Sequence, residues 1–150
     1  MEYTTLGKTG LKISRMGFGG IPIQRIDAEG TKKLMKQLAE EGVNYIDTAR
    51  GYTVSEEYLG YALEGIRDKF VIATKSMART REAWQQTLRR ALAIFEPITL
   101  TCIRYITQVW SSWIQLWEKG AHWKLSWSQG SRQIGHIGLT AHSTEVFECA

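Results

Sequence analysis

Three side chains in the first half of the chain could together move a proton. Asp47 and Lys75 each end an apolar run, at 43–47 and 70–75, and Tyr52 lies in the segment that follows the first run. A lysine held by an aspartate lowers the pKa of a nearby tyrosine, and such a phenol can deliver a proton to a carbonyl oxygen. Taken singly, an aspartate after a strand is more often a turn or cap residue and a lone lysine is usually solvated. The interpretation therefore depends on the three residues lying together.

The elements that must position these residues follow from the local patterns. Gly42 comes directly after a helical stretch, as a glycine at a helix C-terminus does. Ser55 is placed to cap a second helix, with Glu56 and Glu57 as acids of its first turn, and Thr80 is placed to cap a third. The predicted elements are a hairpin formed by 3–6 and 11–14, strands at 15–18, 43–47 and 70–74, and helices at 27–41, from 55 onward and from 80 to about 93.

This alternation of strands and helices predicts parallel βα units. A doubly wound nucleotide-binding fold would need the pattern Gly-x-Gly-x-x-Gly after its first strand. Residues 17–22 read Gly-Phe-Gly-Gly-Ile-Pro, which lacks that pattern, and Pro22 falls where the helix should begin. A (β/α)8 barrel is the better prediction. In such barrels, polar residues at the C-terminal ends of strands are the candidates for chemistry.

Four stretches resemble the aldo-keto reductase family. They are Gly-Leu-Lys-Ile-Ser-Arg-Met-Gly-Phe-Gly-Gly at 10–20, Val-Asn-Tyr-Ile-Asp-Thr-Ala-Arg-Gly-Tyr at 43–52, Ser-Glu at 55–56 and Ala-Thr-Lys at 73–75. The combination is specific, and the resemblance covers roughly residues 3–94. It implies a (β/α)8 barrel that uses NADPH or NADH to reduce a small-molecule aldehyde or ketone.

The resemblance also implies roles for single residues. Tyr52 would be the proton donor, and Asp47 and Lys75 would tune it. Gly19, Gly20 and Ile21 would lie near the cofactor. The fourth member of the family's catalytic set is a histidine at the end of strand four.

The composition changes abruptly near residue 95 and changes back near residue 134. The net charge of the chain is +4, and the window 97–133 supplies +3 of it, because Glu118 is its only acid against Arg104, Lys119, Lys124 and Arg132. Five of the six tryptophans also lie in this window: Trp110, Trp113, Trp117, Trp123 and Trp127.

A shifted reading frame explains this change. Codons can be chosen for residues 97–128 so that a second reading frame encodes another peptide. This frame joins the third base of each codon to the first two bases of the next, and its peptide begins DYIDLYQIH and ends ALEALLE. It has the strand-four pattern of the family and its histidine, whose codon would straddle Tyr105 and Ile106. Tryptophan arises from the shift because TGG appears wherever a codon ending in TG precedes one that begins with G. The shift lies either in the gene or in the reading of its DNA.

The family pattern returns at about 133–143, which resembles strand five and the loop after it. The family contacts the nicotinamide carboxamide there with a Ser-Asn pair, and Thr140 and Ala141 stand in those places, so Thr140 is the remaining candidate. The chain is thus expected to be a partial (β/α)8 TIM barrel of about the first five strands, with its fourth βα unit disrupted. Residues 1–94 are in the family register, 95–132 are aberrant and 133–150 are back in register. Residues 97–131 are expected to be irregular.

The remaining features favour a cytoplasmic protein. The chain has no apolar run of 18 residues and its N-terminus does not resemble a signal peptide. Its two cysteines, Cys102 and Cys149, have neither a disulfide framework nor the spacing of metal ligands. No metal, membrane or nucleic-acid partner is expected, and the oligomeric state stays open.

Three functions remain as hypotheses. The first is the family activity, carried by Asp47, Tyr52 and Lys75. The second is an inactive fragment of such an enzyme, which is the expectation for the purified chain because the strand-four histidine is lost. The third is binding of nucleic acid or a membrane surface by the tryptophan-rich basic window. The frame shift disfavours the third, because it explains the tryptophans and the charge together.

Overall fold

The computed structural model describes residues 1–78, 80–95, 100–107, 134–141 and 144. Their strands and helices follow the alternation predicted from the sequence. In chain order they are β1 (Tyr3–Thr5), β2 (Lys12–Ser14), β3 (Phe18–Gly19), a 3-10 helix (Pro22–Arg25), α1 (Ala28–Glu40), β4 (Tyr45–Asp47), α2 (Ser55–Ala62), a second 3-10 helix (Arg67–Lys69), β5 (Val71–Ser76), α3 (Arg81–Phe95), β6 (Leu100–Thr107) and β7 (Ile134–Ala141).

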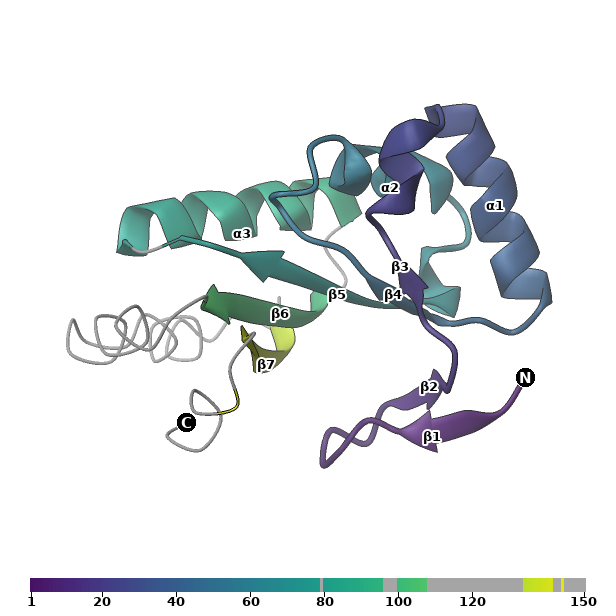
Figure 1. The fold of residues 1–150 in the computed structure, drawn as a ribbon, viewed down its shortest axis with the longest axis horizontal. Helices are drawn as coiled ribbons and strands as arrows, with labels where there is room; N and C mark the ends of the chain where they lie inside the picture. Colours follow the sequence, from purple (N-terminus) through teal and green to yellow (C-terminus); the bar gives the residue numbers. More distant parts are fainter. Residues whose placement is uncertain (79, 96–99, 108–133, 142–143, 145–150) are drawn as a thin grey trace.

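Five of the strands form one parallel sheet in the order β3-β4-β5-β6-β7 (Figure 1). Each strand thus pairs with the next one along the chain, which is the arrangement expected of successive βα units. Because the strands are parallel, their C-terminal ends lie at one edge of the sheet. The described residues therefore form an α/β fold.

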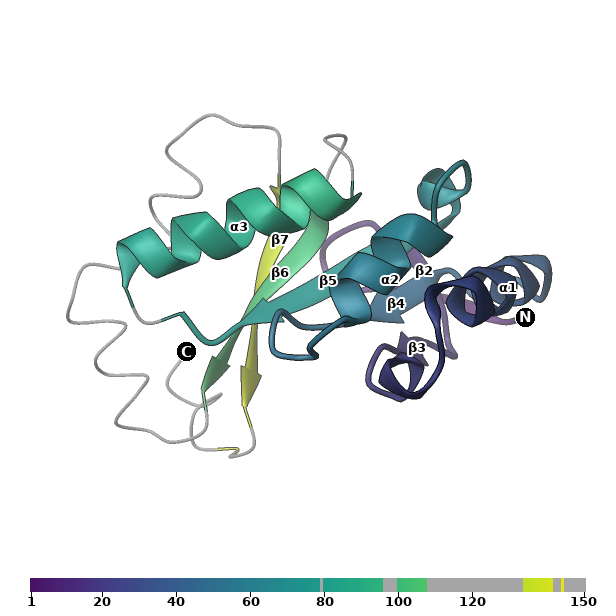
Figure 2. The ribbon, with the colours of Figure 1, turned by 90° about the horizontal axis from the view of Figure 1, so that it is seen from above.

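Helices α1, α2 and α3 lie on one side of the strands, and Figure 2 shows them following one another across the sheet. The core fills the space between these helices and the sheet. Met35 of α1, Ile46 of β4, Leu59 of α2 and Ile72 of β5 are fully buried there, and Trp84 of α3 is 2% exposed. Burial of each large apolar side chain contributes about 1.5–3 kcal/mol, so this layer holds the helices against the sheet.

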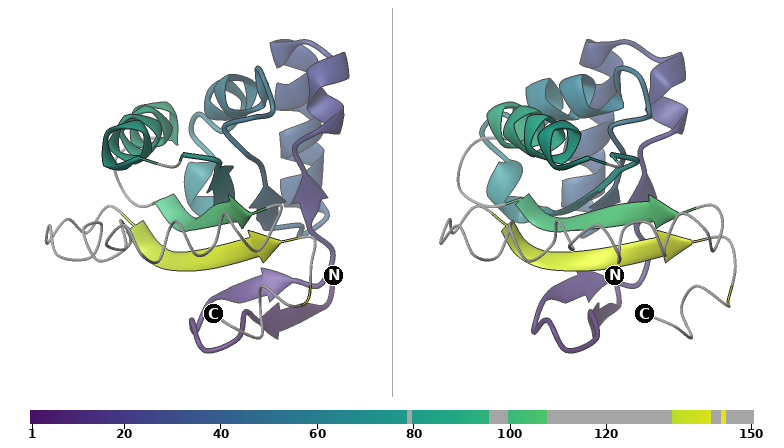
Figure 3. Two further views of the ribbon diagram at one scale, coloured as in Figure 1. Left: turned by 60° about the vertical axis from the view of Figure 1, so that its left-hand side comes forward. Right: turned by 90° about the vertical axis from the view of Figure 1, so that its left-hand side faces the viewer.

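The β1–β2 hairpin lies on the other side of the strands from the helices (Figure 3). Asn44, the residue before β4, ties the hairpin to the sheet. Its Oδ1 accepts from the backbone N–H of Ser14 at 2.6 Å, and its Nδ2 donates to the carbonyl of Lys12 at 3.0 Å. The hairpin is therefore fixed at the N-terminal end of β4, away from the edge where the strands end.

Helix starts agree with one of the two predicted caps and contradict the other. Thr80, a predicted cap, accepts from the N–H of Ala83 at 3.2 Å at the start of α3. Asp27 was predicted as the first residue of its helix, and it instead caps α1 by accepting from the N–H of Gly30 at 2.7 Å. Ser55, the predicted cap of α2, is instead the first residue of that helix, and no side chain caps it.

The expectation that residues 97–131 are irregular is wrong for 100–107, which form β6. This strand pairs with both β5 and β7, with Ala73 beside Cys102 and Cys102 beside His136. The segment Leu-Thr-Cys-Ile-Arg-Tyr-Ile-Thr is rich in β-branched residues, so it suits a strand whatever the origin of its sequence. The tryptophans of 110–127 lie outside the described residues.

Candidate functional site

Asp47 and Lys75 meet at the C-terminal edge of the parallel strands. Asp47 is the last residue of β4 and pairs with Ala73 of β5, so Lys75 lies two residues further along the neighbouring strand. The ladder continues past the end of β4, because the N–H of Thr48 donates to the carbonyl of Ala73 at 2.9 Å. The pairing of the strands, set by their apolar faces, thus brings together two charged residues that are far apart in the sequence.

The Lys75 side chain is buried and held from two directions. Only 6% of the residue is exposed. Its Nζ forms an ion pair with Oδ1 of Asp47 and donates a hydrogen bond to the carbonyl of Thr48 at 2.9 Å. A buried ammonium is stable only when it is paired and hydrogen-bonded, and these two contacts meet that requirement.

Tyr52 lies beneath this ammonium. The Nζ of Lys75 is 5.0 Å from the centroid of the Tyr52 ring, within the range of a cation–π contact. The tyrosine is held in a tight loop, because its N–H donates to the carbonyl of Ala49 at 3.0 Å and its carbonyl accepts from the N–H of Ser55 at 2.8 Å. The structure thus brings the three predicted catalytic residues into one group.

A strained residue follows Tyr52. Thr53 has a φ of 43°, a left-handed conformation that is uncommon for a β-branched residue. Its hydroxyl donates to Oε1 of Gln24 at 2.7 Å, and Gln24 belongs to the 3-10 helix after β3. This contact joins the loop of Tyr52 to the segment that contains Gly20 and Ile21.

An open cleft of about 420 Å³ lies between these two segments. It brings the predicted cofactor-binding residues Gly19, Gly20 and Ile21 into the same site as Asp47 and Tyr52. Its remaining lining residues are Gly17, Phe18 and Pro22. Ile21 is 53% exposed, so the cleft offers an apolar side chain to a ligand.

Gly20 is the residue on which one wall of the cleft depends. Its N–H donates to the carbonyl of Asp47 at 2.8 Å, and its own carbonyl accepts from Oγ of Ser55 at 2.9 Å. A Cβ at this position would lie 2.6 Å from Oγ of Ser55 and 2.9 Å from Oγ1 of Thr48. The backbone therefore approaches β4 and α2 more closely than any residue with a side chain allows.

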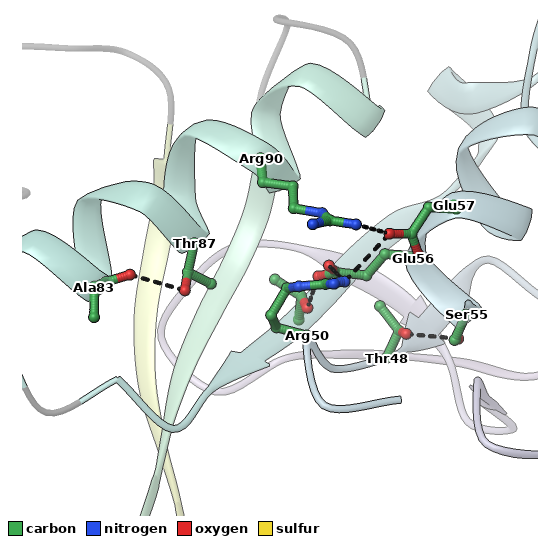
Figure 4. Close-up of polar contacts among 9 residues, drawn as sticks. Thr48, Arg50, Ser55, Glu56, Glu57, Ala83, Thr87 and Arg90 are labelled. Carbon is green, nitrogen blue, oxygen red and sulfur yellow. Dashed lines mark hydrogen bonds and ion pairs between the residues drawn. The ribbon is translucent and has the colours of Figure 1, made fainter. Parts of the chain in front are cut away.

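A second group of charged side chains lies beside Asp47, Tyr52 and Lys75, and no pattern in the sequence predicted it. Figure 4 shows the guanidinium of Arg50 next to both Glu56 and Glu57, with Arg90 of α3 reaching the same oxygen of Glu57. Arg50 Nη1 lies 3.1 Å from Oε2 of Glu56 and 3.4 Å from Oε1 of Glu57. The signal available in the sequence was the pair Ser55-Glu56, which was interpreted as a helix start and as part of the family resemblance, without partners for Glu56.

These charges also change the acidity of Glu57. Burial raises the pKa of this carboxyl. The hydrogen bond from Arg90 and the positive charges of Arg50 and Arg90 lower it by a larger amount, so the pKa lies below its ordinary value of 4.5. Glu57 is therefore held in its charged form in the folded protein. It can keep both arginines in place.

Thr140, the last of the predicted cofactor-binding residues, lies apart from Asp47, Tyr52 and Lys75. It belongs to β7 and pairs with Ile106 of β6, so two strands separate it from β4. It does not line the cleft, although its position near the end of β7 places it at the same edge of the sheet. Its Oγ1 is buried and has no hydrogen-bond partner among the described residues.

The described part of the chain bears on two other kinds of function. Within it, no cluster of three or more histidine, cysteine, aspartate or glutamate residues is arranged to hold a metal ion. None of its helices combines the length and the apolar composition that crossing a membrane requires.

Comparisons with known proteins identify relatives of this chain. The family model for the Aldo/keto reductase family matches residues 15–103. The L-galactose dehydrogenase of Arabidopsis thaliana is 31% identical over 112 residues, covering 60% of this chain and 34% of that protein. The aldo-keto reductase YhdN of Bacillus subtilis is 34% identical over 85 residues, covering 51% of this chain and 26% of that protein.

A solved structure is similar over nearly the whole chain. It is a Pseudomonas aeruginosa protein described as an aldo-keto reductase, with a TM-score of 0.84 and 25% identity. The match covers 99% of this chain and 62% of that one. This chain thus spans about a quarter to a third of the curated relatives it matches and under two thirds of the solved structure.

Proposed function

Because the chain belongs to the aldo/keto reductase family, we propose that its cleft is the site of an NAD(P)H-dependent reduction of a small-molecule aldehyde or ketone. In this proposal Tyr52 gives a proton to the carbonyl oxygen, and Lys75 and Asp47 support that transfer. The described strands would be the first five of a (β/α)8 barrel, whose chemistry is found at the C-terminal ends of the strands.

The observation that carries the proposal is the position of the Lys75 ammonium. It is fixed by Asp47 and by the carbonyl of Thr48, and it lies 5.0 Å from the centroid of the Tyr52 ring. A fixed positive charge near a phenol stabilises the phenolate that remains when the proton leaves. The Asp47 carboxylate keeps that charge in place, so the three residues can act as one acid.

The cleft offers a fitting place for a nicotinamide. A reduced nicotinamide, when bound, supplies the hydride for the carbonyl carbon. Gly19, Gly20 and Ile21 would line its place, because the glycine backbone leaves the cleft open and Ile21 presents an exposed apolar side chain. A side chain added at Gly19 would meet nothing within 4 Å, so there is free space beside this backbone. Thr140 is proposed as a further contact at the end of β7.

A second candidate is a site that is assembled but does not turn over. The observation that favours it is the sequence of β6, Leu100–Thr107, which contains no histidine. β6 is the strand next to Lys75, where the family resemblance implies a histidine that orients the carbonyl. Loss of one positioned acid–base group lowers the rate by about 10²–10⁴-fold.

Oxidation of NADPH with an aromatic aldehyde tests the proposal. The proposal predicts turnover, against the inactivity expected from the sequence, and this turnover should be lost in Tyr52→Phe and retained in Tyr61→Phe, a matched change at an exposed tyrosine of α2. Lys75→Met should lower kcat as well, while circular dichroism shows that the fold is kept. Turnover that is absent in the parent chain, or equal in the parent chain and Tyr52→Phe, would favour the second candidate.

A further inference from the structure

Glu56 is a fully buried carboxylate that the proposed chemistry does not use. Its exposed fraction is 0%, and each of its oxygens has a different partner. Oε1 accepts from the Thr74 hydroxyl at 2.7 Å, and Oε2 accepts from Nη1 of Arg50 at 3.1 Å. An acidic side chain that only stabilised the N-terminus of a helix could remain exposed to water. Burial of a carboxylate is costly unless it is paired and hydrogen-bonded.

Both partners of Glu56 are next to the candidate catalytic residues in the chain. Thr74 directly precedes Lys75 on β5, so its side chain fixes the strand where Lys75 begins. Arg50 precedes Tyr52 by two residues, and its backbone N–H donates to the carbonyl of Lys75 at 2.9 Å. Glu56 therefore contacts both the strand that contains Lys75 and the loop that contains Tyr52.

A second carboxylate and a second arginine also hold Arg50 in place. Glu57 pairs with Arg50 and also with Arg90 of α3, as Figure 4 shows. The guanidinium of Arg50 is thus held between two neighbouring carboxylates of α2. A fixed arrangement of this kind can couple the position of α2 to that of the loop that contains Tyr52. A single solvent-exposed ion pair does not provide such coupling.

We propose that Glu56 is a positioning residue, which holds Lys75 over the ring of Tyr52 through Thr74 and Arg50. The inference rests on the proposed function of Lys75 and Tyr52. It assigns to Glu56 a part in the alignment of the acid rather than a contact with substrate or cofactor.

Nuclear magnetic resonance of the Lys75 side chain tests this without any turnover. In the full chain with lysine labelled with carbon-13 at Cε, the ε-protons of Lys75 should be shifted by the ring current of Tyr52. Lys75→Arg assigns the signal by removing it, and Tyr52→Leu gives the position without the ring. Glu56→Gln should move the signal at least half of the way to that position, and Glu64→Gln, at an exposed glutamate after α2, should not move it.

Thr74 supplies a second pair of variants. Thr74→Val keeps the shape of the side chain but removes the hydroxyl that donates to Glu56, so it should move the Lys75 signal, and Thr74→Ser should restore it. This pair decides the matter if Glu56→Gln does not fold. A Lys75 signal at the parent position in Glu56→Gln and Thr74→Val, with cooperative thermal unfolding kept, would overturn the inference. Failure of the proposed function would instead appear as NADPH turnover that is absent or does not depend on Tyr52, with the Lys75 signal still responding to Glu56.

Discussion

The hydroxyls of Thr48 and Ser55 lie 2.8 Å apart and fill the space that a side chain at residue 20 would need. Both are fully buried, and the Ser55 hydroxyl also donates to the carbonyl of Gly20. The segment after β3, the end of β4 and the first turn of α2 therefore meet at one point. The wall of the cleft next to Asp47 depends on this contact.

Gly20→Ala should destabilise the fold. The added Cβ would meet Oγ of Ser55 at 2.6 Å and Oγ1 of Thr48 at 2.9 Å, and such overpacking costs about 1–3 kcal/mol of the free energy of unfolding. Gly19→Ala is the matched control, because a Cβ there meets nothing within 4 Å. Urea unfolding of the two variants measures the difference. Equal midpoints would show that the segment after β3 is not constrained in this way.

Ile106→His should raise the reductase activity if the missing histidine limits it. Arg104 of β6 is the register partner of Lys75, so alternation along the strand puts position 106 on the same face of the sheet as Lys75. We expect kcat/KM to rise about 10²-fold or more, since this is the scale of one positioned acid–base group. Tyr105→His is the matched control, because position 105 falls on the opposite face. An increase of the same size in both variants would argue against this placement.

The stability of the fold should fall at acidic pH in a way that depends on Glu57. The pKa of Glu57 is lower in the folded state than its ordinary value of 4.5, so the folded state binds fewer protons than the unfolded state. The contribution of Glu57 is therefore complete above about pH 4.5 and is lost as the pH falls through its folded-state pKa. Glu57→Gln should have a lower free energy of unfolding at neutral pH, and its free energy of unfolding should depend less on pH below pH 4.5. Glu64→Gln, with a side chain that is 72% exposed, serves as the control.

The coding DNA should show the shifted frame. Starting at the third base of codon 97, we expect the alternative frame to read DYIDLYQIH, and sequencing across codons 94–134 checks this. Third bases that do not permit that peptide would contradict the frame shift. The change in charge and tryptophan content near residue 95 would then need another explanation.

The sequence by itself determined the features that depend on neighbouring residues. Thr80 was recognised as a cap because a cap contacts backbone groups only a few residues away. The strands at 43–47 and 70–74 were recognised from their apolar runs, and parallel pairing of such runs was enough to predict that Asp47 and Lys75 lie at one edge. Tyr52 was a candidate because it follows the first of these strands, and the family resemblance implied its role as proton donor. The structure has the Lys75 ammonium over its ring.

Only the tertiary structure decided what the polar residues at the start of α2 do. Locally, Ser55 and Glu56 have the pattern of a cap and a first-turn acid, but the packing of α2 on β4 and β5 buries both. In that position their side chains bind Gly20, Thr74 and Arg50, which are outside the helix. The formation of β6 also depended on the tertiary structure. Its apolar, β-branched segment lies next to the open side of β5 and completes backbone hydrogen bonds that would otherwise have no partner. Contacts between segments distant in the chain are set by the whole packing, and no short pattern of residues encodes them.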